Sequence, residues 1–369
     1  MIEQLRALPL NQRIGQLFFI GIAGPEVDHA TRELLTEVSP GGACLFSRNI
    51  READQTRHLL DEIRELSSVT PFLSIDQEGG LVDRLRRIMT PMPAANKLRN
   101  ADDAAQLASI IAETLRMLGF NMDFAPVVDV VDAERAKYSN GLFSRAYGAS
   151  REDVVELSSA FLDTLQQNGI IGCLKHFPGL GASSVDSHEE LPEVNIPHDE
   201  LFSDDLFPYR ELLKTGYAKA IMVAHAAFPQ VNLQETSQNG KLLPSSLSKN
   251  FVTNLLRGEL GFDGLVITDD LEMGAIVKNY GIGEACKMAV NAGVDMLAIC
   301  ADPNAVKEGF NAVLTAVKSG EIAEERIDAS LARIATLKNE LSAPLDLDLE
   351  RLGQLSDAVA VLNEHLDRA

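Results

Sequence analysis

The chain has 369 residues, 46% of them hydrophobic and 24% charged, so it can bury a large core and is not disordered as a whole. Its 33 basic and 54 acidic side chains give a formal net charge of −21, which argues against nucleic-acid or anionic-membrane binding. No apolar run approaches the roughly 20 residues that a membrane-spanning helix needs, and polar residues interrupt the apolar start before a signal-peptide core forms. We therefore expect a soluble, cytoplasmic protein without nucleic-acid or membrane partners.

Eight short apolar runs recur along the chain, separated by longer stretches with helical spacing. They are almost continuously apolar, as expected when helices cover one face of a sheet and packed side chains fill the other. This order predicts a single (β/α)8 barrel of the TIM type. A doubly wound open sheet is the rival fold, but the sequence after the first run is not the glycine-rich phosphate loop typical of it. The runs are residues 16–22, 43–46, 72–75, 122–128, 172–174, 220–223, 265–268 and 294–299.

The intervening stretches read as helices, and 104–118 shows the pattern. Leu107, Ile110 and Ile111 fall at helical intervals there, and Gly119 predicts the stop. From about Ser342 the composition changes, and an amphipathic pattern follows. We expect a barrel over residues 1–341 and a helical extension over 342–369. The extension either packs on the barrel or forms a dimer contact, which leaves monomer and homodimer both open.

Four cysteines, Cys44, Cys173, Cys286 and Cys300, stand far apart without a Cys-x-x-Cys pair. Three of them lie inside or at the end of apolar runs. This placement is typical of buried free thiols in a reducing compartment, and it does not favour disulfides or a metal site.

Polar residues stand where four of the predicted strands end. They are Asp76, Lys175 with His176, His225, and Asp269 with its neighbour Asp270. The carboxyl ends of barrel strands face one mouth, so these groups are expected to converge there. One such residue alone can be a helix cap, but four together predict an active site at this mouth.

The segment after the fifth predicted strand favours a loop that carries proton-transfer chemistry. Pro178, Gly179 and Gly181 disfavour a helix there. Asp186 and His188 follow two residues apart, a spacing at which the carboxylate can orient the imidazole and raise its pKa toward neutrality. His188 then becomes a candidate general acid and base.

Asp269 is the candidate nucleophile. A carboxylate fixed by a rigid strand at the base of a pocket suits attack on the anomeric carbon of a sugar. Asp270 and Glu272 follow closely, and we interpret them as supporting acids near a helix N-terminus. Retaining glycosidases usually employ two carboxylates, so a histidine partner would depart from that rule.

These residues resemble the glycoside hydrolase family 3 β-N-acetylhexosaminidases of the bacterial cell-wall-recycling type, the NagZ-like enzymes. The resemblance runs from about residue 14 to residue 341, and its most specific blocks are the KHFPG…DSH and TDDLEM segments. Its motifs are GQLFFIG, GGACLFSRNI, SIDQEGGLVDRLR, LGFNMDFAPVVDV, KHFPGLG with DSHEELP, MVAHAAFP, GFDGLVITDDLEMGAI and AGVDMLAI.

The resemblance implies a role for each matching residue. Asp269 would be the nucleophile, and His188, held by Asp186, the general acid/base. No metal or organic cofactor is implied. The remaining residues, expected to bind the N-acetylglucosamine ring, are Asp76, Arg145, Lys175, His176 and His225.

Three positions depart from the family's usual pattern. Leu81 stands where arginine usually follows DQEGG, and Leu180-Gly181-Ala182 replaces His-Gly-Asp after KHFPG. The usual Arg-Ser-Phe-Gly appears as Arg145-Ala146-Tyr147-Gly148. None of the replaced residues has an assigned catalytic role, so the departures concern substrate fit more than reaction type.

We therefore expect a retaining exo-β-N-acetylglucosaminidase that acts through a covalent glycosyl-aspartate. The resemblance implies N-acetylglucosaminyl-1,6-anhydro-N-acetylmuramic acid, with or without its peptide, as the small-molecule substrate. Phosphorolysis in place of hydrolysis stays open, because a neutral histidine base tolerates an incoming phosphate better than a carboxylate would. Two further alternatives are a metal-dependent barrel hydrolase that uses His176, His188, His225 and Asp269, and a catalytically silent sugar-binding barrel.

Overall fold

Eight parallel strands close into a barrel in the computed structural model, which describes residues 1–139, 141–184, 190–237 and 239–368. Each of the eight predicted runs supplies one strand, so the predicted (β/α)8 fold is confirmed. A short antiparallel hairpin, β4 (Gln77–Gly79) and β5 (Val82–Asp83), follows β3 outside the barrel. The barrel strands in order are β1 (Phe18–Gly21), β2 (Gly42–Leu45), β3 (Phe72–Ile75), β6 (Met122–Asp123), β7 (Ile171–Phe177), β8 (Ala220–Val223), β9 (Leu265–Asp270) and β10 (Met296–Ile299), which pairs with β1.

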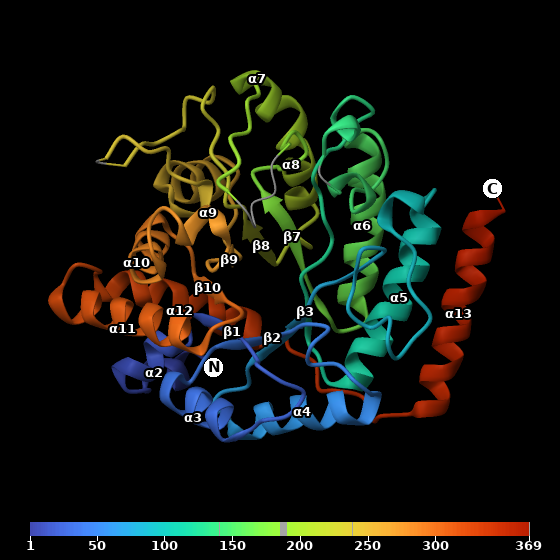
Figure 1. Cartoon of the computed structure of the whole chain (residues 1–369), viewed down its shortest axis with the longest axis horizontal. Coiled ribbons are helices and arrows are strands. Elements are labelled where there is room, and N and C mark those ends of the chain that lie inside the picture. Colours follow the sequence, from blue (N-terminus) through green and yellow to red (C-terminus); the bar gives the residue numbers. More distant parts are fainter. Residues whose placement is uncertain (140, 185–189, 238, 369) are drawn as a thin grey trace.

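Helices surround the strands and alternate with them along the chain (Figure 1). Two short N-terminal helices precede the barrel, and the segment Asn250–Glu259 winds as a wider π-helix between β8 and β9. The helices are α1 (Ile2–Arg6), α2 (Leu10–Gly15), α3 (His29–Val38), α4 (Ala53–Leu66), α5 (Ala101–Leu118), α6 (Arg151–Gln167), α7 (His198–Glu200), α8 (Phe207–Lys214), α9 (Gly274–Val277), α10 (Ile282–Ala292), α11 (Pro303–Ser319), α12 (Glu324–Lys338) and α13 (Leu349–Asp367).

The strands β6 and β7 differ most in length from the predicted runs. The run 122–128 pairs regularly only over β6, and Val127 then makes an isolated bridge to Lys175. Proline has no N–H to donate to a ladder, and Pro126 lies within this run. Conversely, β7 extends to Phe177, so the polar pair Lys175 and His176 belongs to the strand itself.

Aromatic side chains fill the interior of the barrel. The ring of Phe19 lies 5.9 Å from that of Phe72 and 5.3 Å from that of Phe124, centroid to centroid. Gly42 on the neighbouring strand leaves room for them, because a Cβ built there would lie 2.4 Å from Phe19 Cε1. The interior is therefore a packed core, and an open site can form only above it.

The helix predicted over 104–118 is α5, which ends where expected. Gly119 adopts the left-handed conformation at φ 101° and terminates it. The helix begins earlier than predicted because the Asn100 side chain caps it, accepting from the Asp103 N–H at 3.0 Å. Among the described residues, no helix is long and apolar enough to cross a membrane. The four cysteines are buried and free, as predicted.

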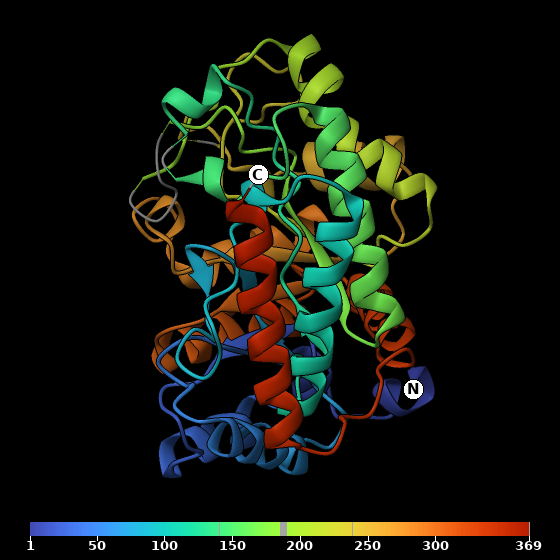
Figure 2. The same ribbon diagram turned by 90° about the vertical axis from the view of Figure 1, so that its right-hand side faces the viewer.

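The C-terminal helix α13 packs along α5 on the outside of the barrel (Figures 1 and 2). It buries one face and ties the other to the barrel by polar contacts. Arg351 pairs with Glu113 of α5 at 2.7 and 2.8 Å. Ser356 Oγ accepts from the Thr90 N–H at 2.9 Å. The buried side chains are Leu352, Leu355, Val359, Leu362 and Leu366.

Candidate active site

A cavity of about 330 Å³ opens at the carboxyl ends of the strands. Five of the predicted site residues line it, and they come from segments far apart in the sequence: Asp76, Arg145, Lys175, His176 and Asp269. The barrel therefore brings together the strand-end groups that the sequence singled out. Two other predicted residues, Asp186 and His188, lie outside the described residues.

Lys175 stands between two carboxylates on one side of the cavity. Its ammonium group lies 2.8 Å from Asp76 Oδ1 and 2.6 Å from Glu78 Oε1. Burial acts to lower the pKa of Lys175, but the two carboxylates outweigh it and raise this pKa above the ordinary value. Lys175 is therefore a fixed cation, and Asp76 keeps its second oxygen for the cavity or for Arg84, 3.7 Å away.

Glu78 holds Arg145 as well as Lys175. The Arg145 guanidinium donates two hydrogen bonds to the Glu78 carboxylate, at 2.8 and 2.9 Å. Burial acts to raise the pKa of Glu78, but both cations lower it far below the usual range. A bidentate pair fixes the plane of the guanidinium, so Glu78 sets how Arg145 faces the cavity.

His176 has a single tautomer that suits its surroundings. Its Nδ1–H donates to Asp129 Oδ2 at 2.8 Å, which leaves Nε2 as an acceptor 3.4 Å from an Arg145 nitrogen. Asp129 Oδ1 also accepts from the backbone N–H of Leu180 at 2.7 Å. The buried Asp129 thus orients the imidazole and holds the start of the loop after β7.

Asp269 ends β9 on the floor of the cavity. Burial acts to raise its pKa, but the neighbouring imidazoles of His176 and His225, the N–H of Asp270 at 2.8 Å from Oδ1 and the Lys175 ammonium group lower the pKa below its ordinary value. The neighbouring Asp270 differs, since burial and the repulsion from Glu272 raise its pKa to about 7. Two adjacent carboxyl groups with separated pKa values indicate two roles, and Asp269 is the one that stays ionised.

His225 lies behind the floor of the cavity. It is fully buried, and both ring nitrogens are engaged: Nε2–H donates to the Asp270 carbonyl oxygen at 3.1 Å, and Nδ1 accepts from the Ser246 hydroxyl at 2.7 Å. The structure therefore places His225 against the strand end that carries Asp269, at a position from which it fixes that strand. It is not among the described cavity-lining residues.

The loop after β7 lies close against the segment after β6. A Cβ on Gly181 would lie 1.8 Å from the Val130 carbonyl oxygen, so only glycine fits there. Beneath it, Arg135 donates to the carboxylate of Asp205 at 2.7 and 3.0 Å and to Glu200 at 2.7 Å. These contacts anchor the stem of the loop at buried ion pairs.

Comparisons with known proteins identify the family of this chain. Residues 9–337 match the model of the glycosyl hydrolase family 3 N-terminal domain. The chain belongs to glycoside hydrolase family 3. A β-hexosaminidase of Tolumonas auensis is 35% identical over 286 residues, which cover 76% of this chain and 81% of the relative. One of Psychromonas ingrahamii is 30% identical and covers 89% and 93% of the two chains.

A solved relative has the same fold. The family 3 β-N-acetylglucosaminidase of Paenibacillus sp. FPU-7 superposes with a TM-score of 0.86 at 37% identity, over 96% of this chain and 69% of the other. This chain is accordingly a glycoside hydrolase, and its relatives are enzymes of the hexosaminidase type. The predicted family resemblance is confirmed.

Sequence reasoning missed three residues of this family 3 site. Glu78 and Arg84 lie in the SIDQEGGLVDRLR block. Glu78 stands three residues after β3, within β4, and Arg84 directly follows β5; nothing in the local sequence pattern marks either residue as a ligand. Asp129 follows the apolar pair that ends the predicted fourth strand, and that position was the available signal. In the described part of the chain, no three His, Cys, Asp or Glu side chains are grouped so that they could hold a metal ion.

Proposed function

We propose that this family 3 enzyme is a retaining exo-β-N-acetylglucosaminidase in which Asp269 attacks the anomeric carbon. The observation that supports it most is a half-buried carboxylate at the end of β9 that lines the cavity and has a lowered pKa, with Lys175, Arg145 and Asp76 around the same cavity. A rigid strand holds the nucleophile, and fixed polar groups hold the ring hydroxyls. These are the two requirements of glycosyl transfer to the protein.

The reaction needs two proton transfers, which we assign to His188. Asp269 forms a bond to the anomeric carbon while the bond to the leaving oxygen breaks and His188 gives that oxygen a proton. His188, now neutral, removes a proton from water, which attacks the anomeric carbon and releases the Asp269 carboxylate. Asp186 would orient the imidazole and raise its pKa. Configuration is retained because each of the two displacements inverts it.

The sugar ring would be bound by the polar groups described above. Asp76, Lys175 and Arg145 are held by ion pairs before substrate arrives, so binding costs little side-chain entropy. His176 presents Nε2 to the cavity as its acceptor, because Asp129 fixes the proton on Nδ1. The family resemblance adds anhydromuramic acid muropeptides as the substrate and cytoplasmic cell-wall recycling as the role.

The decisive experiment separates proton transfer from nucleophilic attack by the chemistry of the leaving group. The variant His188→Ala should cleave N-acetylglucosaminyl disaccharides far more slowly, because the departing alkoxide needs a proton. A nitrophenyl glycoside leaves as a stabilised anion, so its first step should be hurt much less. The intermediate should then accumulate and be found by mass spectrometry on a peptide that contains Asp269.

The matched control is His198→Ala, a histidine on α7 that is not among the described cavity-lining residues, which should leave both substrates unaffected. Equal losses on both substrates with no trapped peptide would place the acid/base elsewhere. Measuring product with and without phosphate in the same assay decides between hydrolysis and phosphorolysis.

A further inference from the structure

The loops beyond the strand ends add apolar side chains to the cavity, whose inner end, at the strand ends, carries the polar groups described above. Leu81 and Val82 of the β4–β5 hairpin and Leu142 of the loop after β6 line it. Seven large apolar side chains are exposed among the described residues, and three of them, Leu81, Tyr138 and Phe143, belong to these two segments. A single exposed apolar residue is unremarkable on a protein surface, but a group of them beside a cavity marks a binding surface.

The two segments approach each other at the mouth. A methyl group built on Gly141 would lie 4.0 Å from Leu81 Cδ1, which is ordinary van der Waals contact. Leu81 is nevertheless 66% exposed, so the neighbouring loop covers only part of it. The uncovered part is apolar surface at the rim of the cavity, where a bound molecule can cover it.

Leu180 adds a second apolar contact from the loop after β7. It lines the same cavity and is 8% exposed, and its backbone N–H is held by Asp129 at 2.7 Å. Leu81 and Leu180 stand at two of the positions where this chain departs from the pattern that it resembles, which has arginine and histidine there. Both departures exchange a nitrogen-bearing side chain for a hydrocarbon in the lining of the cavity.

Two arginines of the segment after β5 face acceptors of the protein itself. The Arg84 guanidinium lies 3.7 Å from the Asp76 carboxylate and 5.7 Å from the ring centroid of Phe46, and its buried Nε has no hydrogen-bond partner among the described residues. Arg86 donates to the backbone carbonyls of Gly80 at 2.6 Å and Asp83 at 3.0 Å. A substrate carboxylate placed here would therefore compete with the Asp76 carboxylate for Arg84 and with two carbonyl oxygens for Arg86, whereas the C–H face of a sugar ring would cover the exposed leucine.

We propose that Leu81, Leu142 and Leu180 form the subsite for the leaving group, and that this subsite selects a neutral aglycone with an apolar face. A second N-acetylhexosamine ring fits that description, and an anhydromuramic acid, which carries a carboxylate, does not. The inference rests on the proposed function, because it assumes that the polar inner end holds the sugar that is cleaved off.

The test compares kcat/KM for three substrates: the neutral disaccharide of two β-1,4-linked N-acetylglucosamines, N-acetylglucosaminyl-anhydromuramic acid, and methyl N-acetylglucosaminide, which has almost no aglycone. The wild-type enzyme should prefer the neutral disaccharide over the muramyl one. The variant Leu81→Ala should lower kcat/KM for the neutral disaccharide roughly 5-fold, mainly through KM, because partial burial of one leucine is lost. The methyl glycoside should be unaffected.

The variant Leu81→Arg should raise the ratio of muramyl to neutral disaccharide turnover roughly 10-fold by supplying a cation. The control is Leu349, a leucine of α13 that is 61% exposed and does not line the cavity; its alanine and arginine variants should change none of the three rates. A wild-type preference for the muramyl disaccharide would overturn the inference, as would equal effects of Leu81→Ala on all three substrates.

A failure of the proposed function looks different. In that case no substrate releases N-acetylglucosamine, and calorimetric binding of the neutral disaccharide to the chain still decides the subsite. Binding roughly 5-fold weaker in Leu81→Ala than in Leu349→Ala would support the inference, and equal binding would refute it.

Discussion

Two clusters of buried charge occupy opposite ends of the same barrel. At the mouth, Asp269 lines a cavity, and its Oδ1 accepts from the Asp270 N–H at 2.8 Å. At the other end, directly before β10, the carboxylate of Asp295 is completely enclosed. It accepts from the Val266 N–H at 3.0 Å and from the Ser330 hydroxyl at 2.9 Å.

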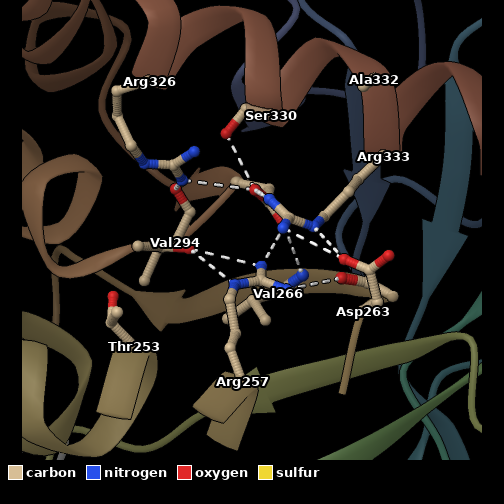
Figure 3. A network of polar contacts seen from close by, with 12 residues as sticks. Thr253, Arg257, Asp263, Val266, Val294, Arg326, Ser330, Ala332 and Arg333 are labelled. Atoms are coloured by element: carbon tan, nitrogen blue, oxygen red, sulfur yellow. Dashed lines mark hydrogen bonds and ion pairs between the residues drawn. The ribbon is translucent and has the colours of Figure 1, made fainter. Parts of the chain in front are cut away.

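Three arginines complete the enclosure of Asp295. The guanidinium nitrogens of Arg257, Arg326 and Arg333 lie 2.6, 3.3 and 3.4 Å from its oxygens. Figure 3 shows these three arginines within one network of polar contacts. A carboxylate with this many donors is fully occupied and has no oxygen left to react. An aspartate at a strand end can therefore react with a substrate only where a cavity leaves one of its oxygens accessible.

Lys338 is a third buried charge and lies at the same end as Asp295. Its ammonium group donates to Gln16 Oε1 at 2.9 Å and stands 5.3 Å over the ring of Phe72. Burial alone lowers the pKa of Lys338 to about 7. The mouth and the Asp295 cluster pair their charges with opposite charges, whereas Lys338 is stabilised by a neutral amide and an aromatic face.

Substitution of Asp269 at the mouth should have the largest effect, and this effect should be on kcat. Replacing the nucleophile in Asp269→Asn should lower kcat on any N-acetylglucosaminide by roughly 10⁴-fold or more, because no covalent path remains. The melting temperature should hardly change, since the asparagine keeps the shape of the side chain. Steady-state kinetics and a thermal melt on the same sample measure both. Substantial remaining turnover would show that another group performs the attack.

At the opposite end the same kind of change should act on stability. Asp295→Ala leaves three arginines without their shared carboxylate, and removing one partner of a buried ion pair costs about 3–5 kcal/mol. Denaturant unfolding should show this loss, while kcat per folded molecule stays at the wild-type value. Should this variant fail to fold, Ser330→Ala removes a single hydrogen bond and should cost about 1 kcal/mol. A change in kcat in either variant would show that the Asp295 cluster contributes to catalysis and not to stability alone.

Substitution of Lys338 should have the smallest effect, a pH-dependent change in the free energy of unfolding. Its folded pKa lies below the unfolded value, so between about pH 7 and 10.5 the unfolded chain binds one more proton. Stability therefore rises with pH across this window, and the cost of burying the lysine is largest at or below pH 7. Lys338→Met should raise stability more at pH 7 than at pH 9, by about 2 kcal/mol of difference. Thermal melts at the two pH values measure it.

The matched control for this prediction is Lys318→Met, which changes an exposed lysine of α11. It should shift the melting temperature equally at both pH values. If Lys338→Met behaves in the same way, then the ammonium group is stabilised in the folded state by more than Gln16 and Phe72.

Hydrophobic patterning along the chain was enough to predict the strands, their order and the first residues of the site. Short, nearly continuous apolar runs that alternate with longer helical stretches favour strands covered on both faces, and all eight appear in the barrel. Parallel strands of a closed barrel end at one mouth, so the positions of Asp76, Lys175 and Asp269 after apolar runs were enough to predict that they meet.

Which buried acidic and basic side chains form ion pairs follows only from the folded structure. Asp269 follows an apolar run and Asp295 stands near the start of one, so their positions predict opposite ends of the barrel, but only the folded barrel gives one a cavity and surrounds the other with arginines. Glu78 carries no local signal because its partners, Lys175 and Arg145, reach it from other strands and loops. Hydrophobic periodicity and composition indicate which face of a strand or helix a residue occupies. The energy of a buried charge depends on neighbours distant in sequence, and folding alone brings those together.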